Sequence, residues 1–145
     1  MIRTAEQYVE SLRDGRVVYQ DGERVEDVPT RYQERVERCA SEFWMAQQPE
    51  HRALFNMEED GEEVSFSFKM PETGEDLQRR RDIVQTLMQR DIGLSRLTGI
   101  DALNGVAYSC EKMDAETGTK YAQNMRKYRA WCKKNDPSIS AAMSD

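Results

Sequence analysis

The stretch from residue 96 to residue 145, RLTGIDALNGVAYSCEKMDAETGTKYAQNMRKYRAWCKKNDPSISAAMSD, decides the fold because it holds two successive helical patterns. Apolar residues recur there every three or four positions, which predicts amphipathic helices from about Ile100 to Lys112 and from about Thr119 to Lys134. Asp136-Pro137 ends the second pattern, since the residue before a proline disfavours helical backbone. The residues expected to face inward are Leu103, Val106, Ala107, Cys110, Tyr121, Met125, Tyr128 and Cys132.

Three further helices are predicted upstream of that stretch. The first follows a Thr4–Gln7 capping box, and Pro49 breaks the second. Gly93 and Gly99 are expected to bracket a linker after the third. The expected bounds are about residues 5–13, 31–47 and 74–92. The expected apolar faces contain Val36, Ala40, Phe43, Trp44 and Gln47 in the second helix and Leu77, Val84, Leu87 and Met88, flanked by Ile83, in the third.

Two Asp-Gly pairs predict β-hairpins, because this dipeptide favours the turn that joins two antiparallel strands. Asp21-Gly22 lies inside RVVYQDGERV, and Asp60-Gly61 precedes Val64, Phe66 and Phe68, which alternate with serines. The fold class is therefore mainly α with two short β-hairpins. A length of 145 residues suits a single domain that spans residues 1–145.

Composition excludes several classes of protein. The net charge is -6 and the pI is near 5.0, which disfavours nucleic acid as a partner, because binding phosphates needs a basic face. No apolar run approaches the roughly 20 residues of a membrane helix, so we expect no membrane partner and a cytoplasmic location. Cys39, Cys110 and Cys132 form no CxxC motif, and we interpret them as buried, reduced thiols.

No complete catalytic constellation is visible in the residues. His51 is the single histidine, in an expected surface loop, with no GxSxG serine or cluster of metal ligands beside it. The run Arg79-Arg80-Arg81 is interpreted as a solvated face, with contact to an anionic ligand such as a CoA phosphate as the alternative. The acidic cluster from Glu58 to Glu63 is also expected to be solvated.

Five aromatic residues sit at helical spacing. Core packing is the expected role, because aromatic side chains dominate protein cores. The alternative is that they line a flavin or aromatic pocket that another domain completes. These residues are Trp44, Trp131, Tyr108, Tyr121 and Tyr128.

Ordered motifs across the chain resemble one family, the flavin-dependent 4-hydroxyphenylacetate 3-monooxygenases and the related 4-hydroxybutyryl-CoA dehydratases. The opening MIRTAEQYVESLRDGRVVYQDGERVEDV is similar to the family's N-terminal signature, and PETGEDLQRRRD is similar to a helix start in its middle. GIDALNG, TGTKY, KKND and AAMSD resemble the dehydratase branch. The resemblance implies the N-terminal helical domain of the acyl-CoA dehydrogenase-like fold.

The resemblance also implies missing parts. Family members continue into a β-rich domain and a C-terminal helical bundle, which hold most of the FAD contacts. We therefore expect FAD in the full-length family but not on this chain alone. The expected partners are the remaining domains or a companion subunit, and a homo-oligomer is possible.

Two diagnostic pairs of the family are replaced here. In the hydroxylase branch an Arg-x-x-x-Tyr pair contacts the phenolic substrate, and the matching positions are Thr98 and Ala102. In the dehydratase branch two cysteines bind an iron-sulfur cluster, and the matching positions are Gly93 and Leu97, so no cluster is expected. The resemblance implies a substrate-binding set of Arg96, Thr98, Asp101, Ala102 and Asn104. A helix N-terminal cap or a turn anchor is the competing role of Asp101 and Asn104.

The sequence therefore predicts the N-terminal substrate-pocket domain of an FAD-dependent 4-hydroxyphenylacetate 3-hydroxylase-like oxidoreductase, as a fragment or split subunit that is inactive alone. The alternatives are a 4-hydroxybutyryl-CoA dehydratase-like lyase domain and a non-enzymatic protein-interaction module. An unrelated helical binding domain is a further alternative.

Overall fold

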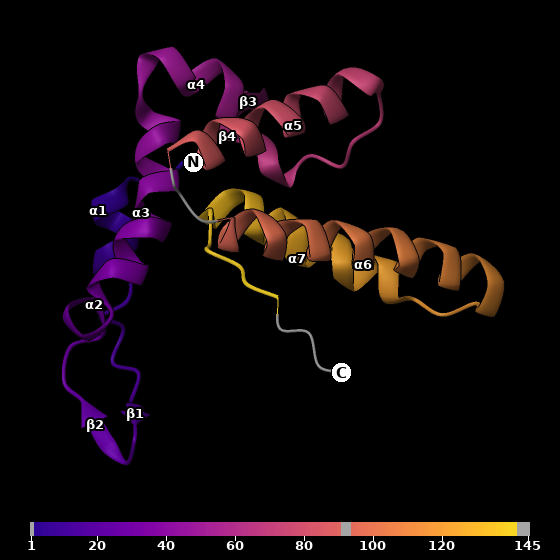
Figure 1. The fold of residues 1–145 in the computed structure, drawn as a ribbon. Helices are drawn as coiled ribbons and strands as arrows, with labels where there is room; N and C mark the ends of the chain where they lie inside the picture. The colour runs from indigo at the N-terminus through magenta and orange to yellow at the C-terminus, as the bar shows by residue number, and fades with distance from the viewer. Residues whose placement is uncertain (1, 91–93, 142–145) are drawn as a thin grey trace.

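The computed structural model describes residues 2–90 and 94–141, and it confirms a mainly helical fold with two small antiparallel sheets (Figure 1). The helices are α1 (Ala5–Glu10), α2 (Val28–Arg31), α3 (Gln33–Gln47), α4 (Pro49–Phe55), α5 (Gly74–Gln89), α6 (Ser95–Thr117) and α7 (Tyr121–Asn135), with a 3-10 turn η1 (Phe66–Phe68). The strands are β1 (Val18–Gln20), β2 (Glu23–Val25), β3 (Asn56–Glu59) and β4 (Glu62–Ser65).

Two helical arms project from the molecule, and α4, α5, β3 and β4 lie beside the place where the arms meet (Figure 1). One arm is built on α3, which packs against α1 and leads to the β1–β2 hairpin at its far end. The other arm is the antiparallel pair α6 and α7, which contact each other along their length and project away from the rest of the molecule. Because the second arm projects, much of its surface has no other element of this domain to pack against.

Three apolar clusters stabilise this arrangement. Burying one large apolar side chain contributes about 1.5–3 kcal/mol. The first cluster joins α3, α4, α5 and α6 through Met45, Ala46, Phe55, Phe66, Ile83, Leu87 and Leu97. The second joins α1 and α3 through Tyr8, Val36, Ala40 and Phe43. The third joins η1, α6 and α7 through Phe68, Ile100, Leu103 and Cys132.

Both predicted hairpins are confirmed. Asp21 and Gly22 have φ of 53° and 84°, and Asp60 and Gly61 have φ of 53° and 77°, as a turn with two left-handed residues requires. The strand predicted beyond Val64 is wrong in part, because β4 ends at Ser65. The 3-10 turn η1 follows and places Phe66 and Phe68 in two different clusters.

The linker expected between Gly93 and Gly99 is wrong at its second end. Helix α6 begins at Ser95 and runs straight through Gly99. This glycine serves a close approach instead, because a Cβ there would lie 2.1 Å from the carbonyl oxygen of Ile139. Gly93 lies outside the described residues, as do Ile92, the predicted end of the third helix, and most of AAMSD.

Several helix details also differ from expectation. Helix α1 ends at Glu10 and not near residue 13, and Pro29 lies in the first turn of the short helix α2. Pro49 does end α3, but it also starts α4, so His51 lies on a helix and not in a loop. A proline suits the first turn because its missing N–H would have no helical partner.

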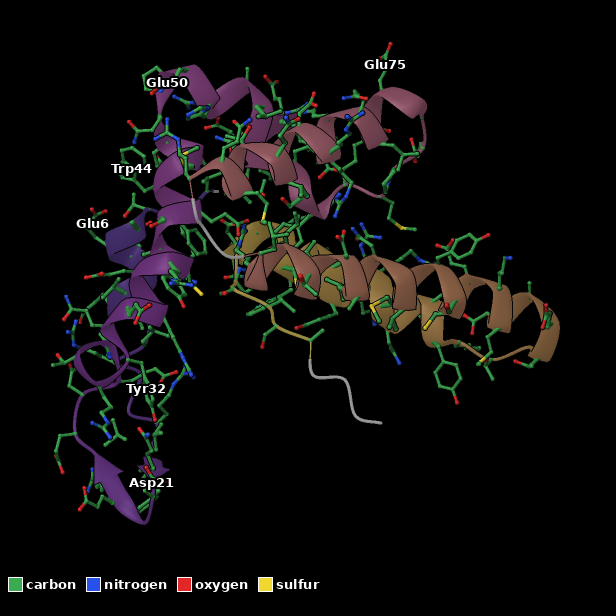
Figure 2. All side chains as sticks on the ribbon, viewed as in Figure 1. Glu6, Asp21, Tyr32, Trp44, Glu50 and Glu75 are labelled. Atoms are coloured by element: carbon green, nitrogen blue, oxygen red, sulfur yellow. The ribbon has the colours of Figure 1, made fainter. Side chains whose placement is uncertain are left out.

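The predicted inward faces are wrong at seven positions, whose side chains are exposed. On α3, α5 and α6 these are Trp44, Gln47, Leu77, Met88 and Val106, and on α7 they are Tyr121 and Tyr128. Trp44 projects outward from α3 in Figure 2. Periodicity locates an apolar stripe but not the element that covers it, and no element among the described residues covers these side chains.

Candidate functional site

Helix α6 divides the five predicted substrate-binding residues between two faces. Thr98, Asp101 and Ala102 are exposed, whereas Arg96 and Asn104 are only 4% and 7% exposed. The division follows from a helical period of 3.6 residues, which sets positions 96 and 104 opposite positions 98 and 102. The set therefore does not converge on one pocket within this domain.

Arg96 lies at the centre of a buried ion cluster. Its Nη1 donates to Oε1 of Glu42 at 2.9 Å, and its Nη2 donates to Oδ1 of Asp136. The backbone N–H of Arg3 donates to the other oxygen of Asp136 at 3.1 Å. The guanidinium also lies over the ring of Phe43, with 4.5 Å to the centroid. Arg96 thus joins α3, α6 and the end of α7.

Burial and charge act against each other on the groups of this cluster. Burial raises the pKa of Glu42, and the nearby Arg96 only partly offsets that effect. Burial alone would lower the pKa of Arg96, but Asp136 and Glu42 outweigh it and raise the pKa. One guanidinium faces two carboxylates, so the cluster stabilises the domain and leaves no cation for an external ligand.

Asp101 and Asn104 lie in the interior of α6, so the helix-cap role considered for them is wrong. Asp101 forms an ion pair with Arg80 of α5. Arg80 Nη1 also donates to the carbonyl of Ser67 at 2.9 Å, and the Asn104 amide lies 3.5 Å from the same oxygen. The Asn104 Oδ1 is buried without a hydrogen-bond partner among the described residues.

The outer face of α6 is the only part of the predicted set that is free to meet another molecule. The Thr98 hydroxyl donates back to the Leu94 carbonyl at 2.9 Å, and Ala102 offers a methyl group. Leu97, one of the two positions matched to cluster cysteines, is 2% exposed and belongs to the first apolar cluster. It faces the core, away from Thr98 and Ala102.

Arg79 and Arg80 are not the solvated face that the arginine run suggested. Arg79 donates to the backbone carbonyls of Ala53, Leu54 and Asn56 and lies 3.9 Å above the centroid of the Phe66 ring. These contacts tie α5 to the end of α4, since a guanidinium has five donors to satisfy. Arg81 alone of the three is exposed.

The remaining candidates stay structural. His51 Nε2 lies 3.4 Å from the Arg90 guanidinium on the surface, and no group of three metal-binding side chains occurs within residues 2–90 and 94–141. The acidic hairpin is partly paired rather than wholly solvated, through Glu59 with Lys133 and Glu63 with Arg52. The cysteines are free, but Cys132 alone is fully buried.

Core packing is the wrong prediction for all five aromatic residues. Their exposed fractions are 46% for Trp44, 52% for Tyr108, 53% for Tyr121, 47% for Tyr128 and 52% for Trp131. The ion partners of Arg96 were not predicted from the sequence. Glu42 lies among the buried apolar residues of α3, and a carboxylate on an apolar helix face is the signal that would have indicated a buried cation.

The profile of the family described as 4-hydroxyphenylacetate 3-hydroxylase N terminal matches residues 4–145. The chain belongs to this family. The 4-hydroxybutyryl-CoA dehydratase/vinylacetyl-CoA-Delta-isomerase of Clostridium aminobutyricum is 29% identical over 100% of the chain and 31% of its own length. The 4-hydroxyphenylacetate 3-monooxygenase oxygenase component of Thermus thermophilus is 28% identical over 100% of the chain and 30% of its own length.

The fold of family members agrees with this assignment. The oxygenase component of 4-hydroxyphenylacetate 3-monooxygenase complexed with FAD matches with a TM-score of 0.80 and 26% identity, over 92% of this chain and 28% of that one. The N-terminal helical domain of an acyl-CoA dehydrogenase-like fold is thereby confirmed. The chain spans about 30% of the length of the curated relatives that it matches. Its described helices include none with the length and apolar character of a membrane span.

Proposed function

We propose that this chain forms one wall of the substrate pocket in an FAD-dependent 4-hydroxyphenylacetate 3-hydroxylase-like oxidoreductase. The observation that carries the proposal is the outward position of Thr98 and Ala102 on α6. These two positions match the substrate-contacting pair of the hydroxylase branch, and they are exposed in a chain that spans about 30% of its relatives. The other walls would come from the remaining polypeptide.

The side chains at the matched positions carry the diagnostic pair of neither branch, so the hydroxylase-like assignment rests on the description of the family that the chain matches. An iron-sulfur cluster needs cysteine thiolates, and the matching positions hold Gly93 and Leu97. Thr98 and Ala102 also lack the guanidinium and phenol of the hydroxylase pair. We therefore propose a substrate that is held mainly by contacts from the other walls.

The residues of this chain could contact the flat ring of FAD, but they offer no site for its phosphates. The outer face of α6 offers small side chains at Thr98, Ala102 and Gly105, against which a flat ring can lie. Its nearest charged group, Asp101, is anionic and paired with Arg80, which suits neither phosphate of the cofactor. When bound in the assembled enzyme, the flavin would supply the redox chemistry and the protein the orientation.

The first experiment tests for flavin on the purified chain and on its assembly with the missing parts. Absorbance from 300 to 500 nm is recorded with and without FAD, beside size-exclusion chromatography. We expect a colourless chain alone and a yellow complex once the polypeptide that matches the remaining length of the relatives is added. Tight, stoichiometric FAD binding by the 145-residue chain alone would overturn the division of labour proposed here.

A non-enzymatic interaction module is the second candidate, and exposed apolar side chains favour it. Leu77 and Met88 of α5 are 59% and 60% exposed, and Trp44 is 46% exposed. Exposed apolar patches mark protein–protein contacts. The two functions separate in the assembled complex, because an interaction module would join a partner without creating a flavin site.

A further inference from the structure

The outer surface of α7 carries two parallel stripes, one cationic and one aromatic. Lys120, Lys127 and Lys134 follow one another at intervals of seven residues, and each is exposed. Tyr121 and Tyr128 follow the same interval, and Trp131 lies one turn beyond Tyr128. A seven-residue interval keeps side chains on one side of a helix, so both stripes run along α7. We call these six residues the Lys-Tyr face.

The aromatic stripe is ordered although it is exposed. The Tyr128 and Trp131 rings stack with 6.0 Å between centroids and 8° between planes. Burial and the adjacent Cys132 thiol raise the pKa of Tyr128. Tyrosine and tryptophan give large contact areas at a low entropic cost, because they have few rotatable bonds.

Within residues 2–90 and 94–141, no carboxylate pairs with the lysines of the cationic stripe. Helix α7 contains five basic residues and no acidic one, although the chain as a whole has a net charge of -6. On its inner side the cations are used, since Lys133 pairs with Glu59 and Arg129 donates to the Phe68 carbonyl. Lys127 and Lys134 are paired with no carboxylate of the described residues.

The positive charge and the seven-residue spacing of the Lys-Tyr face indicate what kind of partner it binds. Seven-residue spacing with lysines beside an apolar stripe is the pattern by which one helix packs along another, where flanking charges choose the partner. A second copy of α7 would set lysines against lysines. Three of the four carboxylates of α6 are already engaged, Asp101 by Arg80, Glu111 by Arg126 and Asp114 by the start of α7. The face therefore fits an acidic helix from outside this domain.

We propose that the Lys-Tyr face docks an acidic amphipathic helix supplied by the polypeptide that carries the rest of the flavoenzyme. This inference rests on the proposed function and identifies the surface through which the wall is held. The partner helix carries carboxylates opposite Lys127 and Lys134 and apolar side chains against Tyr128 and Trp131. It spans about four turns, because the 15 residues of α7 extend about 22 Å.

The test uses Trp131 as its own reporter. The chain contains two tryptophans, so Trp44→Phe leaves Trp131 as the sole source of tryptophan fluorescence. The probe is the polypeptide from the same genome that matches the remaining length of the relatives. On titration we expect the Trp131 emission to shift to shorter wavelength and its quenching by acrylamide to fall, because docking removes the indole from water.

Charge reversal then tests whether binding occurs through the Lys-Tyr face or through another surface. Lys127→Glu with Lys134→Glu is expected to weaken binding at least tenfold. Lys112→Glu on α6, an exposed lysine that lies 4.8 Å from the Tyr108 ring centroid, is the matched control and is expected to bind as the parent chain does. Circular dichroism and the unfolding midpoint confirm that each variant is folded.

Each other outcome has a defined meaning. Binding with unchanged Trp131 emission and no effect of charge reversal would overturn the docking face while leaving the proposed function in place. No binding by any variant would overturn both. Comparable binding of a single-stranded oligonucleotide through the same lysines would identify an anion surface instead and would also overturn the inference.

Discussion

Arg96 donates from Nη1 to Oε1 of Glu42 at 2.9 Å, although 54 residues separate them in the sequence. The two side chains are 4% and 2% exposed, and Asp136 accepts from the same guanidinium. An ion cluster this deeply buried is costly to break, because removing one partner leaves an uncompensated charge. Arg96 is therefore a structural residue of α6, and the exposed face with Thr98 and Ala102 is the one that can contact a ligand.

Replacing Arg96 with methionine is expected to destabilise the domain by about 3–5 kcal/mol, because Glu42 and Asp136 would face each other without a cation. Urea unfolding followed by circular dichroism measures the change. Arg126→Met is the matched control, since Arg126 pairs at 3.7 Å with Glu111 on the surface and such pairs contribute at most about 1 kcal/mol. Equal losses in the two variants would contradict the assignment.

Glu42→Gln is expected to change the pH dependence of stability. Because the folded pKa of Glu42 is raised above its ordinary value, the folded state binds a proton more tightly than the unfolded state does. That contribution is present below the unfolded pKa of about 4.5 and is lost as the pH rises through the folded pKa. The stability of the wild type relative to Glu42→Gln should therefore fall as the pH rises from 4.5.

Chemical unfolding of the wild type and Glu42→Gln at a series of pH values gives this comparison. The low pKa values of Asp14 and Asp27, both about 2, act only at acidic pH and leave the window above 4.5 clear. A constant difference between the two proteins across that window would show that Glu42 does not titrate as described.

Local features of this fold were predictable because their causes lie within a few residues. The Thr4 capping box forms as expected, with Thr4 Oγ1 accepting from the Gln7 backbone N–H at 3.2 Å. The turns at Asp60-Gly61 and Asp21-Gly22 need left-handed backbone, which glycine and aspartate tolerate, so the dipeptides identify them. The resemblance of whole motifs likewise placed the family correctly.

The site was predictable only in its location on α6. Periodicity could not tell which of Arg96 and Thr98 faces the core, because the answer depends on Glu42 and Asp136, which lie far away in the sequence. The exposure of Trp131 could not be predicted either, because a pattern of apolar residues does not show whether the element that packs against them belongs to the same domain.

Gly99 and Gly105 make a matched pair on α6. Gly105→Ala is expected to stabilise the domain by about 0.8–1 kcal/mol, because alanine is the better helix former and nothing lies within 4 Å of the added Cβ. Gly99→Ala is expected to destabilise it by about 1–3 kcal/mol, because the Cβ would lie 2.1 Å from the Ile139 carbonyl oxygen.

Thermal unfolding measures the two glycine variants, whose midpoints are expected to shift in opposite directions. Stabilisation by both substitutions would mean that the segment after Asp136 does not cross α6 at Gly99.

The exposure of Thr98 and Ala102 on the outer face of α6 can be tested by introducing larger side chains there. Thr98→Arg with Ala102→Tyr introduces the hydroxylase pair at its matched positions, and because both sites are exposed, each change should alter stability by no more than about 0.5 kcal/mol. Leu103→Ala, next to Ala102 but only 8% exposed, should cost about 2–5 kcal/mol. Urea unfolding of both variants decides the orientation of the helix. A loss for the double variant as large as that for Leu103→Ala would place Thr98 and Ala102 in the core, and the pocket wall proposed here would then lie elsewhere.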